Sequence, residues 1–390
     1  MSRFAQRVTG FGPTIFSEMS RLAAEHHAVN LSQGFPDFDG PEPAKAAAIA
    51  AIQAGHNQYA QGIGHPGLRQ AIAAHAARFY GQAVDPKTEV TVTAGATEAL
   101  LAALLGLVDP GDEVIVFEPY FDCYVPDILM VGAVPRLVAL RPTADPLNPL
   151  WTFDPAELAA AFNARTRLIL VNTPHNPTGK VFTAEELGQI AALCQRWDVL
   201  ALSDEVYEHL VYDGARHVRL ATLPGMAART ITVSSHGKTF NFTGWKVGWS
   251  IAPADLSAAV RRAHQYITFC APAPLQAGAA VSLSLEAAYF QALQAEYSRR
   301  RAFLLETLRA AGLRVGAPQG AYYLMADFAP LGFTGGDVAF CRWLTLEIGV
   351  AAIPASAMSP SATHWARFAF CKRLETLTAA AERLRRLRSA

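Results

Sequence analysis

Two lysines lie eight positions apart in the stretch SSHGKTFNFTGWKVGW, residues 234–249, where their neighbours are small, aromatic and hydroxyl residues. A solvent-facing segment would mix charges of both signs, and a core would contain neither lysine. A lysine amine can add to a carbonyl carbon or can pair with an anion. Lys238 and Lys246 are therefore either solvated loop residues, which is the usual fate of lysine, or the two cations of a chemical site.

Residues with further chemical capacity come at the ends of short apolar runs. Each has an ordinary structural explanation as a helix cap, a packed ring or a turn residue. Together they offer an anion-binding helix start, a stacking ring, amide and phenol groups, a carboxylate and an amine. They are Gly95, Ala96 and Thr97 after EVTVT, Tyr120 and Phe121 after EVIVFEP, Asn172 and Asn176 beside RLILVNT, Asp204 with Tyr207 one helical turn later at VLALSDE, and Ser235 and Lys238 at the end of TITVSS.

The elements that must position these residues are short strands. Runs rich in β-branched residues at 89–95, 113–119, 167–173, 199–205 and 230–235 alternate with helical stretches rich in alanine and leucine. That alternation predicts a parallel sheet with helices on both faces, whose ligands bind beyond the carboxyl ends of the strands. After about residue 284, a helical segment at 285–311, strands near 322–327 and 366–370 and a closing helix from Leu374 predict a smaller α+β domain.

Pyridoxal 5′-phosphate is a ligand that uses all of these groups. A lysine amine can bond to its aldehyde, a helix start can hold its phosphate, and a carboxylate can keep its ring nitrogen protonated. The protonated ring then withdraws the electron pair that forms at the Cα atom of an amino acid. The set of residues therefore predicts this cofactor.

Two glycine motifs have the spacing of nucleotide sites but lack their context. Gly62, Gly64 and Gly67 follow HNQYA rather than an apolar strand, and Pro66 interrupts their turn, so they do not support an NAD-dependent dehydrogenase. The tripeptide GKT at 237–239 lacks the first glycine of a P-loop, because residue 232 is threonine. The sequence contains no metal-protease or serine-hydrolase motif either, and no metal is expected.

Five motifs, TAGATEAL, EPYFDCY, NTPHNPTGK, SDEVYEHL and SSHGKTFNFTGWKVGW, resemble those of the fold-type I aminotransferases of class I, and within them the methionine and kynurenine (glutamine-type) aminotransferases. The resemblance extends from NLSQGFPDFDGP at 30–41 to ARFAF at 366–370. It implies an α/β fold in which helices sandwich a mostly parallel seven-stranded sheet, with a smaller α+β domain. The implied division is an N-terminal arm with the first part of the small domain at 1–39, a large cofactor-binding domain at 40–283 and the C-terminal small domain at 284–390.

The resemblance also implies roles for particular residues. Lys238 is expected to bond to the cofactor aldehyde and to move the proton at the substrate Cα, and Asp204 to bind the ring nitrogen. Arg367 is expected to bind the substrate α-carboxylate through its planar fork. The remaining implied contacts are Tyr207 and Asn176 at the ring hydroxyl, Phe121 stacked on the ring, Asn172 in the pocket wall, Ala96, Thr97, Ser235 and Lys246 at the phosphate, Tyr59 at the phosphate of a neighbouring subunit, and Gly34 with Asn176 at the substrate.

The implied activity is a ping-pong transfer of the α-amino group from an L-amino acid (methionine, glutamine, aromatic or kynurenine-like) to a 2-oxo acid. Many class I relatives have arginine where this chain has Lys246, whereas the kynurenine-type subgroup has lysine. No second arginine can be placed beside a distal carboxylate, so large uncharged or sulfur-containing side chains are expected, under a roof formed by Ile15 and Phe16.

Two other functions stay open at this point. A pyridoxal phosphate-dependent cysteine-conjugate C–S β-lyase would use the same fold, because a Cα carbanion can also expel a β leaving group. A non-catalytic regulator that binds the cofactor would need a DNA-binding domain, for which the chain has no residues left over.

Composition limits the partners. Lysine plus arginine equals aspartate plus glutamate at 33 each, so no nucleic-acid or membrane partner is expected. The chain is 51% apolar and only 17% charged, which predicts that part of its surface is buried in a homodimer. The five cysteines form no C-x-x-C pair, and the N-terminus lacks an apolar signal segment, so a cytoplasmic location is expected.

Overall fold

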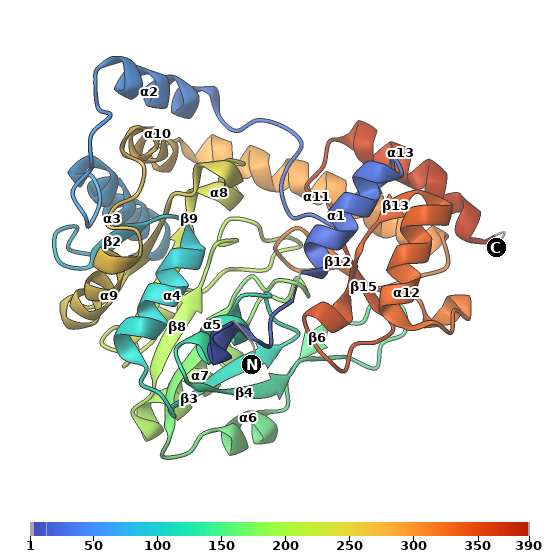
Figure 1. The fold of residues 1–390 in the computed structure, drawn as a ribbon, viewed down its shortest axis with the longest axis horizontal. Coiled ribbons are helices and arrows are strands. Elements are labelled where there is room, and N and C mark those ends of the chain that lie inside the picture. Colours follow the sequence, from blue (N-terminus) through green and yellow to red (C-terminus); the bar gives the residue numbers. More distant parts are fainter. Residues whose placement is uncertain (1–3, 13, 389–390) are drawn as a thin grey trace.

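The computed structural model describes residues 4–12 and 14–388, and its central element is a seven-stranded sheet (Figure 1). Each strand is parallel to its neighbours except β10, which is antiparallel to both of its neighbours. The strand order is β2 (Val90–Thr93), β10 (Gly248–Ile251), β9 (Thr230–Ser235), β8 (Leu200–Asp204), β7 (Thr166–Asn172), β3 (Glu113–Glu118) and β4 (Val134–Ala139). The predicted sheet, mostly parallel and seven-stranded, is confirmed.

The sequence runs located five of these strands but not β4 or β10. β4 lies at the edge of the sheet, and most of its side chains are partly or fully exposed. It therefore lacks the continuous apolar run by which a buried parallel strand is recognised. β10 has only four residues and begins at Gly248, inside the motif that carries the two lysines.

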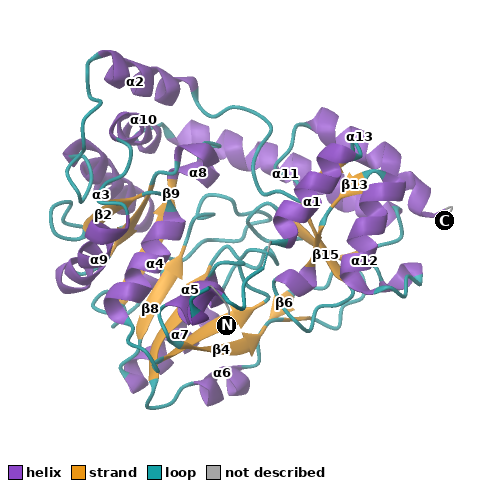
Figure 2. Ribbon diagram, viewed as in Figure 1, coloured by secondary structure: helices purple, strands orange, loops and turns teal. Residues whose placement is uncertain are grey.

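Helices cover both faces of the sheet because successive side chains of each strand point to opposite faces (Figure 2). On one face, α4 (Ala96–Leu107), α5 (Tyr124–Met130) and α9 (Ala254–Ile267) pack on side chains that include Val114 and Val116. On the other face, α6 (Pro155–Ala161) and α7 (Ala184–Trp197) pack on the alternate side chains, including Ile115 and Phe117. α7 begins with a capping box between Thr183 and Glu186.

A third group of helices packs beside β2 and β10. α2 (Glu42–Gln53), α3 (Pro66–Tyr80) and α10 (Ala273–Leu283) lie together there, and their apolar side chains form one core with those of the two strands. Among the described residues, no helix combines the length and the hydropathy that a membrane span requires.

The smaller α+β unit predicted after about residue 284 is present. Its antiparallel sheet has the order β11 (Arg314–Val315), β12 (Tyr323–Asp327), β15 (Trp365–Ala369) and β14 (Ile353–Pro354). Its helices are α11 (Ala287–Ala310), α12 (Gly336–Trp343) and α13 (Leu374–Leu384). A separate two-stranded sheet joins β5 (Arg141–Pro142) to β6 (Trp151–Thr152).

N-terminal residues join this smaller unit. α1 (Ile15–Glu25) contributes Met19 to the same core, and β1 (Val29–Asn30) pairs in parallel with β13 (Val350–Ala351). The chain therefore passes through the smaller unit first, builds the larger sheet, and returns. The precise limits 1–39, 40–283 and 284–390 stay a prediction.

Candidate active site

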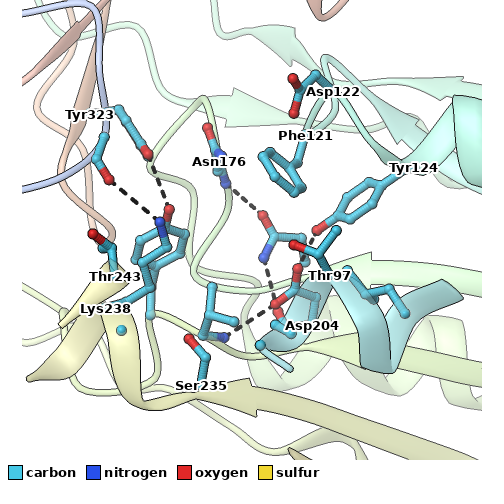
Figure 3. A pocket seen from close by; sticks show the side chains of 18 of the residues that line it. Thr97, Phe121, Asp122, Tyr124, Asn176, Asp204, Ser235, Lys238, Thr243 and Tyr323 are labelled. Carbon is cyan, nitrogen blue, oxygen red and sulfur yellow. Dashed lines mark hydrogen bonds between the residues drawn. The ribbon is translucent and has the colours of Figure 1, made fainter. Parts of the chain in front are cut away.

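A cavity of about 320 Å³ lies at the carboxyl ends of the parallel strands, where they face the smaller unit. Its wall contains residues from both units, including Lys238 after β9, Asp204 at the end of β8 and Arg367 in β15. Every residue that the sequence assigned to the cofactor or substrate lines this cavity except Tyr59 and Ile15. Figure 3 shows that many of these side chains converge on the cavity.

Lys238 extends into the cavity from α8 (His236–Thr239), the short helix that follows β9. Its Nζ atom donates to the carbonyl oxygen of Gly34 at 3.4 Å, and the ring centroid of Tyr322 lies 5.8 Å away. Burial lowers the pKa of the Lys238 amine from its usual 10.5 to about 8. At pH 7 about a tenth of this amine is therefore uncharged and nucleophilic, far more than for a solvated lysine.

Asp204 lies deeper, at the carboxyl end of β8. Its Oδ2 atom accepts a 2.6 Å hydrogen bond from the Tyr124 hydroxyl, and its Oδ1 atom accepts one from the backbone N–H of Val206 at 3.3 Å. Burial raises the pKa of the Asp204 carboxyl to about 6, although the bond from Tyr124 and the charge of Lys238 oppose that shift. A carboxylate so placed has room for one cationic partner in the cavity, such as a protonated ring nitrogen.

The segment after Asp204 differs from the expected helix. Residues 206–209 form a turn rather than a helical turn, so the spacing argument for Tyr207 was wrong. Tyr207 still lines the cavity, because the turn is buried and its hydroxyl pairs with that of Tyr323 at 3.2 Å.

The start of α4 forms a place for an anion. Gly95 precedes the helix with a φ of 82°, a conformation that favours glycine, and the first N–H groups of the helix face the cavity. A Cβ atom at Gly248, on the neighbouring strand, would lie 2.5 Å from the Ala96 nitrogen. Only glycine at position 248 therefore lets β10 pass this close to the helix start.

The side chains around the helix start carry matching groups. Thr97, Ser235 and Lys246 line the same wall, and none of their polar side-chain atoms has a partner among residues 4–12 and 14–388. The Lys246 Nζ atom lies close to Gly95, at 3.2 Å from where a Cβ atom would be. Hydroxyls, free N–H groups and one ammonium together form a cradle for a phosphate.

Arg367 is the buried cation of the smaller unit. Its Nη1 atom donates to Asn176 Oδ1 at 2.9 Å and its Nη2 atom to the Ser32 carbonyl at 3.1 Å. Its Nε atom is buried and has no partner within the described chain. Arg367 lines the cavity and forms no ion pair with a carboxylate among the described residues, so its guanidinium suits a carboxylate ligand.

The polar side-chain atoms of Asn172 form hydrogen bonds within the protein and hold the cavity wall in place. Its Nδ2 atom donates to the Asp204 carbonyl at 2.9 Å, and its Oδ1 atom accepts from the Asn176 backbone N–H at 2.7 Å. Asn176 keeps its own amide N–H₂ group available to the cavity. Phe121 presents its ring to the cavity and packs edge-on against Tyr124, with centroids 5.6 Å apart.

Other lining residues were not singled out from the sequence. Tyr124 lies three positions after Phe121 in EPYFDCY, and its motif was the only signal that pointed to it. Tyr323 begins strand β12 of the smaller unit, where it resembles an ordinary core residue. Gln33 and Asp122 are further lining residues of this kind. Of the two residues expected to form a roof, Phe16 lines the cavity, whereas Ile15 packs in the core of the smaller unit.

Tyr59 lies outside the cavity of its own chain. Its side chain is 84% exposed, and its ring packs edge-on against Phe269 with centroids 5.3 Å apart. Its predicted contact with the phosphate in a neighbouring subunit stays a prediction.

Pyridoxal phosphate fits this set of residues. The cradle at α4 offers donors to a phosphate, the unpaired guanidinium of Arg367 suits a carboxylate, and the buried carboxylate of Asp204 suits a protonated ring nitrogen. Lys238 supplies a partly neutral amine for the aldehyde.

A second buried group, His75, Glu208 and His209, has the residue types of a metal site. The two imidazoles hydrogen-bond each other through their Nε2 atoms at 2.8 Å. Glu208 accepts from Arg219 at 2.6 Å and from Ser234 at 2.8 Å. Because its polar atoms already satisfy one another, the group is explained as an internal hydrogen-bond network.

Known proteins resemble this chain over nearly its whole length. A family model described as aminotransferase class I and II matches residues 26–384. The chain is 43% identical over 378 residues to the methionine aminotransferase of Escherichia coli, covering 96% of each sequence. It is 41% identical over 405 residues to kynurenine–oxoglutarate transaminase 3 of Mus musculus, covering 97% of this chain and 89% of the mouse protein.

Solved structures have the same fold. The structure of N-succinyldiaminopimelate aminotransferase from Mycobacterium tuberculosis superposes with a TM-score of 0.95 at 46% identity, covering 98% of this chain and 100% of the other. The named relatives thus differ in the amino acid they act on.

Proposed function

The chain belongs to the class I and II aminotransferases, and we propose that its preferred amino donors have large uncharged or sulfur-containing side chains. It is a pyridoxal 5′-phosphate-dependent enzyme that catalyses transamination. The named relatives are all aminotransferases, so the β-lyase alternative has no support among them. The donor proposal is supported by the relatives that act on methionine and kynurenine, and by the cations of the cavity.

The proposed preference for uncharged donor side chains rests on the three cations of the cavity. Lys238, Lys246 and Arg367 are the basic residues in its wall, as far as the structure describes the chain. We assign them to the aldehyde, the phosphate and the α-carboxylate, which leaves no cation for a distal carboxylate. This assignment disfavours aspartate and glutamate as donors, and N-succinyldiaminopimelate as well, because its side chain carries further carboxylates.

Each residue then has a defined task. When bound, the cofactor supplies an aldehyde that takes up the amino group and a ring that withdraws the electron pair left at Cα. Arg367 binds the α-carboxylate of the donor, and Asn176 holds its guanidinium by accepting from Nη1. Lys238 takes the proton from the donor Cα, because its amine has a pKa of about 8 and is partly free to accept it.

Asp204 and its neighbours keep the charge distribution suited to that proton transfer. The Asp204 carboxylate stabilises a proton on the ring nitrogen, and the Tyr124 hydroxyl keeps that carboxylate ionised by donating to it. Phe121 limits movement on one side of the ring, and Tyr207 and Asn176 offer hydrogen bonds to the ring hydroxyl oxygen. The same groups serve the reverse half-reaction with a 2-oxo acid.

A donor panel tests this function. Purified enzyme with pyridoxal phosphate is given methionine, glutamine, kynurenine, phenylalanine, aspartate, glutamate or N-succinyldiaminopimelate, with a 2-oxo acid acceptor, and formation of the product oxo acid is followed. We expect the first four to react and the three with distal carboxylates to be poor donors. A preference for N-succinyldiaminopimelate would contradict the proposal, and parallel double-reciprocal lines are expected for the ping-pong order.

We also propose that the protein is a cytoplasmic homodimer. Exposed Tyr59 packs on Phe269, which is 38% exposed, and Tyr266, three positions earlier in the chain, is 90% exposed; a second copy would bury such side chains. The free cysteines, none of which forms a disulfide in the described chain, support a reducing compartment. Sedimentation equilibrium should give twice the 41.9 kDa chain mass. Cell fractionation should place the enzyme in the soluble cytoplasmic fraction, and a monomer or a secreted protein would contradict these proposals.

A further inference from the structure

The charges of the cavity leave one group without a role. Within the described chain five charged side chains line it, and the proposed function uses four of them: Lys238, Lys246, Arg367 and Asp204. The fifth is Asp122, which follows the ring of Phe121 directly in the sequence.

The carboxylate of Asp122 has hydrogen-bonding capacity that no side chain of the described protein uses. Asp122 is partly buried, and apart from the backbone N–H groups of its own residue and of Cys123, its carboxylate has no hydrogen-bond or ion-pair partner in the described protein. It does not cap α5, because the N-cap residue is Cys123 and no side-chain cap bond is present. In Figure 3 it lies beside Phe121 in the part of the cavity away from Asp204 and Ser235.

The surroundings of Asp122 belong to the substrate rather than to the cofactor phosphate. Burial raises the pKa of the Asp122 carboxyl, and the charges of Arg367 and Lys238 lower it. Both cations line the same cavity as Asp122 and act on its charge, although neither forms an ion pair with it among the described residues. Those are the residues assigned to the α-carboxylate and to Cα, so Asp122 stands near the start of the donor side chain.

We propose that Asp122 selects the donor side chain: it accepts a hydrogen bond from a terminal N–H group, such as a carboxamide or an aryl amine, and it repels side chains that end in a carboxylate. This inference rests on the proposed function and refines its substrate class. A half-buried carboxylate that no side chain pairs with gains a charge-assisted hydrogen bond from a neutral N–H donor. A second carboxylate beside it would place two like charges in a poorly solvated space.

Glutamine, glutamate and methionine test this selection because their side chains are similar in length. Asp122→Asn keeps the shape of the residue and removes its charge. We expect kcat/KM for glutamine to fall and that for glutamate to rise, each by roughly 10-fold or more. Methionine, which has no terminal donor or charge, should change by less than about 2-fold.

Two further variants provide an alternative to Asp122→Asn and a control for the loss of one charge. Asp122→Ser should give the same inversion if the asparagine variant folds poorly. Glu382→Gln removes one charge from an exposed position of α13, outside the cavity, and should leave the donor preference unchanged. Equal changes for all three donors, or none, would overturn the inference and leave Asp122 as a structural residue.

A binding measurement separates this inference from the proposed function. Glutarate and glutaramate are unreactive, nearly isosteric ligands that differ only by a carboxylate and a carboxamide. Calorimetry on the holoenzyme should show tighter binding of glutaramate in the wild type and a ratio near one in Asp122→Asn. If methionine is not transaminated, the proposed function fails, and the calorimetric ratio still decides the role of Asp122. An unchanged ratio in the variant would refute the selection.

Discussion

Replacement of Tyr124 by phenylalanine is the sharpest perturbation of the site, because it removes one hydroxyl from a buried carboxylate. The Tyr124 hydroxyl donates to Asp204 Oδ2 at 2.6 Å, and the two side chains are 1% and 3% exposed. A hydrogen bond to a charged group contributes about 1.5–3 kcal/mol, which corresponds to about 1–2 pKa units. Tyr124→Phe should therefore raise the pKa of Asp204 from about 6 to about 7–8.

The assay is the pH dependence of cofactor affinity. Apoenzyme is titrated with pyridoxal phosphate between pH 5 and pH 9, and the bound fraction is read from protein fluorescence. A protonated ring nitrogen needs the ionised carboxylate of Asp204, so wild-type affinity should weaken below a pH of about 6. In Tyr124→Phe the weakening should begin about 1–2 pH units higher, with roughly 10-fold lower affinity at neutral pH.

Two variants serve as controls for this prediction. Asp204→Asn should abolish the pH dependence in this range, because the titrating group is gone. Tyr212→Phe removes another buried hydroxyl that donates at 2.6 Å, but its acceptor is the Ala321 carbonyl outside the cavity, so the profile should match wild type. Coincident profiles for Tyr124→Phe and wild type would refute the coupling between Tyr124 and Asp204.

Three further outcomes are expected. Lys238→Ala should lose both transamination and the visible absorption of the cofactor bonded to lysine. Lys246→Ala should keep most of the turnover at saturating cofactor, but it should bind the cofactor roughly 10-fold more weakly. Gly34→Ala should lower the free energy of unfolding by about 1–3 kcal/mol and raise KM, because the added Cβ overlaps the Tyr323 hydroxyl; urea unfolding and kinetics measure both. The free energy of unfolding should fall on acidification. Burial lowers the pKa values of four histidines to about 4 or about 3, whereas in the unfolded chain the value is about 6.5. Urea unfolding midpoints near pH 7 and near pH 5.5 measure the decrease. These residues are His75, His175, His209 and His236.

The buried histidines determine the direction of the pH effect, and each of these three predictions has a result that would contradict it. Below pH 6.5 the unfolded chain binds more protons than the folded one, so each histidine should cost about 1.4 kcal/mol per pH unit until its folded pKa is reached. Midpoints that do not move with pH would contradict this. The Tyr323→Phe change should partly restore Gly34→Ala if the hydroxyl is the obstacle. Complete loss of turnover in Lys246→Ala, with activity kept in Lys238→Ala, would reverse the roles of the two lysines.

The sequence by itself determined the sheet and most of the cavity wall. Apolar runs such as 199–205 identify strands locally, and the carboxyl ends of parallel strands meet at one edge, so Asp204 and Lys238 were expected together. Edge strand β4 was missed because its exposure removes the apolar run. Residues 206–209 were misjudged because a three-residue spacing does not distinguish a helix from a buried turn.

Only the tertiary structure decided which atoms of these residues remain free. Arg367 is oriented by Asn176 and by the carbonyl of Ser32, which lie 191 and 335 positions away in the chain. Tyr124 meets Asp204 across 80 positions, and Asp122 is left without a side-chain partner among the described residues. Burial shifts the pKa of Lys238 and of Asp204, and hydrogen bonds oppose the shift at Asp204; both effects depend on how distant segments pack. Residue types and local spacing can therefore identify the groups of this site, but only packing determines their charge and their free hydrogen-bonding capacity.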